Sequence, residues 1–205
     1  MISEPELRIA ELLTARLCHE LVGPVAAVAN GADLLSEDDL EIDLDALALI
    51  GDSARRAAGR LQFYRFAYGF GGTHMAGPQP SQLAAAYFET SGMACRYGES
   101  VPSLPLSQQK LACNLLVFAA EALVHGGILA VDAVACGFRV EAAGEGVAVP
   151  RERLQALRLA TPVAELTPRT VHGYFTGRLA QMEGWRLVDK LMPGRLCIEA
   201  LAAAR

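Results

Sequence analysis

The best candidate for chemistry in this sequence is a histidine followed directly by a glutamate, His19 and Glu20, within a long helical stretch. A neutral imidazole nitrogen is a competent nucleophile near pH 7, and a neighbouring carboxylate can orient the ring or accept its proton. A single histidine on a helix is also often a solvated surface residue, and the glutamate can serve solubility alone. The surrounding residues must decide between these interpretations.

The helix around His19 has one apolar face and one open face. At about 100° per residue, an arc of apolar residues runs from Leu13 to Leu35, and His19 lies roughly opposite it. The residues that share or border its side are Arg16, Gly23, Ala26, Ala27 and Asn30. Most of them are small, so the backbone of another protein could approach closely. We therefore expect these five residues to bind a partner.

Two helices must position this face. A capping-box pattern at Ser3 and Glu6 and apolar steps of four and seven predict a helix over 3–36, with a bend or local loosening at Pro24. A second apolar stripe predicts a helix over 43–69. Two antiparallel helices leave their far sides uncovered, so we expect a homodimer in which two hairpins form a four-helix bundle.

The pattern changes after a segment rich in glycine and proline, 69–80. Helices are predicted over 81–90, 107–124, 151–159 and 168–183, and strands over 94–97, 128–135, 136–143, 146–149 and a hairpin over 185–201. The predicted class is α+β, with a helical hairpin domain over 1–72 and a small α/β sandwich over 80–205.

Composition excludes several functions. The net charge of -5 and the lack of a cluster of basic and aromatic residues argue against nucleic acid. The N-terminal segment alternates charged and apolar residues, which argues against a signal peptide or membrane span. Five scattered cysteines suggest reduced thiols in the cytoplasm. The motif HELVG lacks the second histidine of a zinc protease, and His74, His125 and His172 show no ligand spacing, so no metal site is expected.

The segment CHELVGPVAAVANGADLL has the form of the phosphoacceptor box of histidine kinases: histidine, acid, leucine, and proline five places after the histidine. Together with DSARRAAGRLQFYRFAYG, it resembles the ChpT family of histidine phosphotransferases from alphaproteobacteria. The resemblance implies that His19 accepts phosphate from the receiver domain of a hybrid histidine kinase and passes it to response regulators, with Glu20 assisting. Such a protein would be a phosphotransferase in a bacterial phosphorelay.

The second half resembles a histidine-kinase ATP-binding domain whose chemistry has been lost. Asn114 remains, but Phe118 stands where a magnesium-binding asparagine is expected, and Ala142 stands where an aspartate would recognise adenine. The resemblance therefore implies a degenerate domain without a bound cofactor. Magnesium would be supplied by the partner receiver domain.

Two other functions fit parts of this pattern. The chain could be a non-catalytic pseudokinase scaffold that binds receiver domains, which a phosphotransfer assay would decide. It could also be an ATP-dependent histidine kinase, although Phe118 and Ala142 argue against that. Arginines on the two helices could contact an acidic receiver pocket or could simply be solvated; they are Arg16, Arg55, Arg56, Arg60 and Arg65.

Overall fold

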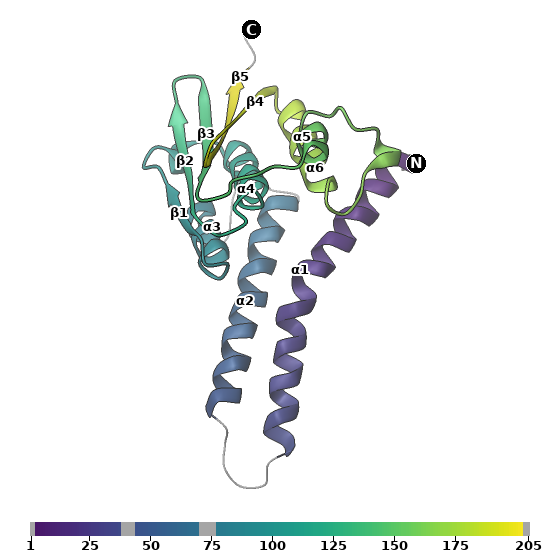
Figure 1. The fold of residues 1–205 in the computed structure, drawn as a ribbon, viewed down its shortest axis with the longest axis vertical. Helices are drawn as coiled ribbons and strands as arrows, with labels where there is room; N and C mark the ends of the chain where they lie inside the picture. Colours follow the sequence, from purple (N-terminus) through teal and green to yellow (C-terminus); the bar gives the residue numbers. More distant parts are fainter. Residues whose placement is uncertain (1–2, 38–43, 70–76, 203–205) are drawn as a thin grey trace.

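A long antiparallel helical hairpin carries the N-terminal third of the protein (Figure 1). The computed structural model describes residues 3–37, 44–69 and 77–202. Helix α1 spans Glu4–Glu37 and helix α2 spans Leu44–Tyr68, each within one residue of the predicted ends. The Glu6 carboxylate accepts bonds from the Ser3 N–H and hydroxyl at 2.8 and 2.9 Å, which caps α1. The predicted domain boundary at residue 72 lies outside the described residues.

A five-stranded sheet and four α-helices follow. The helices are α3 (Pro80–Glu89), α4 (Leu106–Ala120), α5 (Arg151–Leu157) and α6 (Val171–Met182), with 3-10 turns η1 (Val101–Ser103) and η2 (Val163–Glu165). The strands are β1 (Ala94–Tyr97), β2 (Ile128–Val134), β3 (Gly137–Ala143), β4 (Trp185–Met192) and β5 (Arg195–Ala202). Their order is β1-β2-β3-β5-β4, and β1 pairs with β2 in parallel while the other pairs are antiparallel. The predicted α+β class is confirmed.

The core lies between one face of this sheet and α4. Alternate residues of β3 and β5 point into it, and the register places Phe138 opposite Ala200 and Val140 opposite Ile198. The last turns of α2 join the same core through residues such as Phe63, which is fully buried. The hairpin and the α/β layer therefore share apolar packing at one end of α2.

The predicted strand over 146–149 is wrong. In the structure, residues 147–150 form no strand. The Ala148 N–H instead donates to the carbonyl of Ala122 at 3.1 Å, and Val147 and Val149 pack against the core from an irregular segment. These valines are apolar because they pack against the core, not because they belong to the sheet.

Helix α1 continues through Pro24 and also reaches the α/β layer. Its N-terminal part leans away from α2 toward α5 and α6 (Figure 1). Arg8 there donates to the carbonyls of Val163 and Leu166 at 3.2 and 3.1 Å. The phosphoacceptor-like helix is thus held by the second half of the chain as well as by α2.

Candidate phosphoacceptor site

His19 lies exposed on α1, and its ring makes no hydrogen bond or ion pair with the described part of the chain. Gly23, Ala26 and Asn30 are exposed on the turns that follow, while Ala27 is half-buried. A Cβ added at Gly23 would contact nothing within 4 Å. The predicted open surface beside His19 is therefore present on this chain.

Glu20 lies beside His19 in sequence, but its carboxylate is bonded to α2. Arg60 Nη1 donates to Glu20 Oε2 at 2.7 Å and to the Glu20 main-chain carbonyl at 2.8 Å. The two side chains are 22% and 26% exposed, so this pair is shielded more than an ordinary surface ion pair. In this arrangement, Glu20 connects α1 to α2 instead of contacting the His19 ring.

The structure corrects the expected position of Arg16. Its side chain is buried, and its Nη2 bonds to Oε1 of Glu121, at the end of α4. Arg153 of α5 bonds to the other oxygen of the same carboxylate. Arg16 therefore does not belong to the exposed face of His19, because the α/β domain covers that part of α1.

This charge cluster, formed by Arg16, Glu121 and Arg153, influences the pKa of both arginines. Burial is the largest single influence and opposes the charge on Arg16, but the attraction of Glu121 together with that of Tyr68 and Tyr64 outweighs it, so the pKa of Arg16 is raised. For Arg153, burial dominates and lowers the pKa, although Glu121 opposes that shift. Arginine ionises far above neutral pH, so two cations share one carboxylate.

A buried histidine lies next to the charge cluster. His172 Nε2 lies 3.0 Å from the Asn114 carbonyl, and its Nδ1 lies 2.9 Å from the Tyr68 hydroxyl. A carbonyl only accepts, so Nε2 carries the proton and Nδ1 accepts from Tyr68. Burial, with added repulsion from Arg16, holds the pKa of His172 well below its usual range. His172 is neutral, and it connects α2, α4 and α6.

The residues that would correspond to a nucleotide site are closely packed. Phe118 is fully buried, the Arg153 guanidinium lies 5.0 Å from the centre of its ring, and a Cβ at Gly173 would come within 3.1 Å of it. Ala142 is also fully buried, in β3. The Asn114 amide donates to the Ala67 and Lys110 carbonyls at 2.9 Å. These residues are packed inside the protein, where the Asn114 amide nitrogen is bonded to main-chain carbonyls and its Oδ1 has no hydrogen-bond partner among the described residues.

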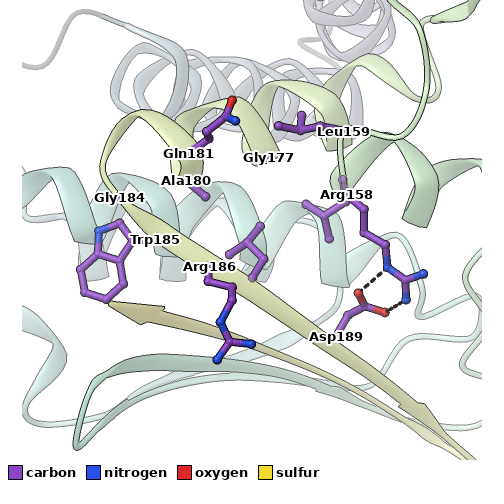
Figure 2. A pocket seen from close by; sticks show the side chains of 11 residues that line it. Arg158, Leu159, Gly177, Ala180, Gln181, Gly184, Trp185, Arg186 and Asp189 are labelled. Carbon is purple, nitrogen blue, oxygen red and sulfur yellow. Dashed lines mark hydrogen bonds and ion pairs between the residues drawn. The ribbon is translucent and has the colours of Figure 1, made fainter. Parts of the chain in front are cut away.

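A pocket of about 440 Å³ lies elsewhere, between α5, α6 and β4 (Figure 2). Trp185 lies toward one end, and toward the other Arg158 bonds to both carboxylate oxygens of Asp189 at 2.9 and 2.7 Å. The lining does not include Phe118, Ala142 or Asn114. This pocket is therefore not the counterpart of a kinase nucleotide site.

Not every residue of the site could be found from the sequence. No sequence pattern predicted that one network joins Glu121, Arg153, Tyr68 and His172, because no motif relates residues separated by about a hundred positions. The arginines of α2 also differ: Arg60 is bonded internally, Arg55 pairs with Asp52, and Arg56 and Arg65 are exposed.

An exposed histidine on a helical hairpin, joined to an α/β domain whose interior is closed by its own side chains, is the arrangement expected of a histidine phosphotransferase. The family model for the histidine phosphotransferase C-terminal domain matches residues 79–190. The protein phosphotransferase ChpT of Brucella abortus (strain 2308) is 33% identical over 190 residues, covering 88% of this chain and 89% of that protein. The chain belongs to the ChpT family of histidine phosphotransferases.

Solved structures are also similar. A bacterial phosphotransferase superposes with a TM-score of 0.81 and 29% identity, covering 98% of both chains. The histidine kinase domain of the Erythrobacter litoralis EL346 blue-light activated kinase matches with a TM-score of 0.42 and 14% identity, over 97% of this chain and 92% of that one. The predicted family is confirmed: the protein is a phosphotransferase of two-component signalling and acts in a phosphorelay.

Proposed function

We propose that His19 is the residue that carries the phosphoryl group. The observation that supports this most directly is its free, exposed imidazole, followed by the open surface at Gly23, Ala26 and Asn30. An unprotonated ring nitrogen would attack phosphorus as the aspartate carboxylate of the donor leaves, so that an N–P bond replaces an O–P bond. The chain need only present the ring in line with the breaking bond.

The donor in this proposal is the phosphorylated receiver domain of a hybrid histidine kinase, and the recipients are response regulators. Each receiver would bring its own acidic pocket and magnesium, so this chain would bind no metal. Exposed Arg56 is a positive charge on α2 that could meet such an acidic surface. Transfer in both directions would use the same docked geometry.

We propose further that this chain binds no nucleotide and draws phosphate only from receivers. The packing of Arg153 over Phe118 supports this, because a nucleotide would have to displace a buried cation and a fully buried ring. Ala142 offers no side-chain acceptor for an adenine amino group.

The apolar surface of the hairpin supports a homodimer. Val22, Val25, Leu47 and Leu61 are each more than half exposed in the single chain. A groove of about 540 Å³ between α1 and α2 includes Leu17 and Leu61 in its lining. Covering this surface with a second hairpin would remove a large apolar area from water, as in a four-helix bundle.

We place the protein in the cytoplasm. Within the described residues, α1 is the one helix whose length and apolar composition would let it cross a membrane. Its Arg8 and Arg16 nevertheless bond to residues of the α/β domain, as expected for a helix of a soluble protein. All five cysteines are free thiols, which suits a reducing compartment.

Transfer from a labelled receiver domain tests the phosphoacceptor. Incubation with a phosphorylated receiver should label the wild-type protein in an acid-labile, alkali-stable form, whereas His19→Ala and His19→Gln should fold and take no label. His125→Gln, which alters another exposed histidine, should be labelled normally. ATP with magnesium in place of the receiver should give no label. Labelling of His19→Ala would refute the proposal, and an unlabelled wild type would favour a scaffold.

A further inference from the structure

The helix around His19 contains a defect in its own hydrogen bonding. Pro24 has no N–H, so the main-chain carbonyl four residues before it, that of Glu20, loses its donor within α1. This carbonyl belongs to the residue next to His19. Without another donor, the turn that presents the histidine would be the least constrained part of the helix.

Arg60 supplies the missing donor from the opposite helix. A single nitrogen, Nη1, bonds to the Glu20 carbonyl at 2.8 Å and to the Glu20 carboxylate at 2.7 Å. One side chain of α2 thus holds both the backbone and the side chain of the residue beside His19. A charged donor makes these bonds stronger than those between neutral groups.

Arg60 is itself held in place by the α/β domain. Its guanidinium lies 6.0 Å from the centre of the Tyr87 ring on α3. The Tyr87 hydroxyl lies 2.7 Å from that of Tyr64, and its ring stacks on Phe63 at 4.3 Å, both on α2. The position of Arg60 is therefore fixed from α2 and from α3.

We propose that Arg60 is a positioning residue for phosphotransfer, which replaces the hydrogen bond lost at Pro24 and thereby fixes the turn of α1 that carries His19. Arg60 does not contact the reacting atoms in this role. The inference rests on the proposed function, because it assumes that His19 reacts, and it assigns Arg60 to internal structure instead of to receiver docking.

A double-mutant cycle tests it. In Pro24→Ala, residue 24 regains an N–H that can bond to the Glu20 carbonyl within the helix, so the need for Arg60 should diminish. Arg60→Met should lower the transfer rate at saturating receiver about tenfold or more, and change the receiver concentration for half-maximal rate by less than about twofold. Arg60→Lys, which keeps a cationic donor, should recover part of the rate. In the Pro24→Ala background, Arg60→Met should lower the rate by less than about threefold.

A matched control removes a charge far from this site. Lys190 is exposed on the edge strand β4, and the Lys190→Met protein should transfer phosphate at the wild-type rate. Circular dichroism should show that every variant folds, and light scattering should show that each has the same mass in solution as the wild type. An Arg60→Met protein that transfers at the wild-type rate, or a loss of equal size with and without Pro24, would overturn the inference.

Amide hydrogen exchange separates this inference from the proposed function, because it needs no phosphate. Arg60→Met should speed exchange across residues 21–28 of α1, and adding Pro24→Ala should slow it again. Unchanged exchange would overturn the positioning role. If the wild type accepts no phosphate from any receiver, the proposed function fails, whereas the exchange result still decides whether Arg60 fixes this turn.

Discussion

Removing the carboxylate from the charge cluster should destabilise the protein strongly. Glu121 bonds to Arg16 and Arg153, whose side chains are each only 10% exposed. Glu121→Gln would leave two nearly buried guanidinium groups close together with no counter-charge. Breaking a buried ion pair in this way costs about 3–5 kcal/mol, and the 29% exposure of Glu121 places the expected loss near the lower end, about 3 kcal/mol.

The loss can be measured by urea unfolding followed by tryptophan fluorescence. Trp185 is the only tryptophan, and its ring lies 6.0 Å from that of buried Phe138, so its emission should report on the α/β core. For a chain of this size, about 3 kcal/mol corresponds to a fall in Tm of about 6–12 °C. Glu145→Gln removes an exposed carboxylate in the same half of the chain and should change the free energy of unfolding by less than about 0.5 kcal/mol.

A double-mutant cycle distinguishes the charge cluster from general loss of packing. Arg16→Met added to Glu121→Gln should cost less than the two single changes summed, because one uncompensated charge is removed with it. If Glu121→Gln lowers the free energy of unfolding by less than about 1 kcal/mol, the three charges are solvated as if on the surface, and the reasoning from burial is refuted.

Two further predictions concern His172 and the dimer. The pKa of His172 is lowered in the folded protein, so below about pH 6.5 the unfolded chain binds one more proton than the folded chain does. The free energy of unfolding should therefore be at its full value above about pH 6.5 and should fall by about 1.4 kcal/mol for each pH unit below it. Urea unfolding at several pH values should show a smaller slope for His172→Gln and an unchanged slope for His125→Gln. For the dimer, light scattering should give twice the chain mass for the wild type. The control Leu191→Arg, which changes an exposed residue on β4, should keep that mass, whereas Leu61→Arg should dissociate or unfold the protein. A stable monomeric wild type would contradict the dimer.

Local patterns were sufficient to predict most elements of the fold. The capping pair Ser3 and Glu6, the strand over 94–97 and the hairpin that turns at Pro193 and Gly194 are all set by residues close together in sequence. The prediction of a strand over 146–149 was wrong, because a short run of valine and alanine suits both a strand and an irregular segment that packs against the core.

The surroundings of His19 depend on contacts that no local pattern contains. A helical projection places Arg16 near His19, but it cannot show that Glu121, 105 residues later, buries that arginine. The bond between Arg60 and Glu20 likewise joins positions 40 apart. The phosphoacceptor candidate was visible from sequence, whereas the residues that fix its helix became visible only when distant elements were placed together.

In the proposed function, His19 must be both exposed to a partner and held in a fixed position. A histidine that must meet a partner protein has to remain exposed, so burial of its own ring cannot fix its geometry. Constraint must then come from its neighbours, and α1 has an anchor on each side: Arg16, three residues before, is bonded to the α/β domain, and Glu20, one residue after, is bonded to α2. Both anchors are hydrogen-bonded ion pairs that are partly shielded from water, and such pairs fix the position of a helix better than exposed ion pairs do. In the proposed function, the α/β domain contributes to transfer without binding a nucleotide, because its Glu121 and Tyr87 help to hold the helix from which the imidazole projects.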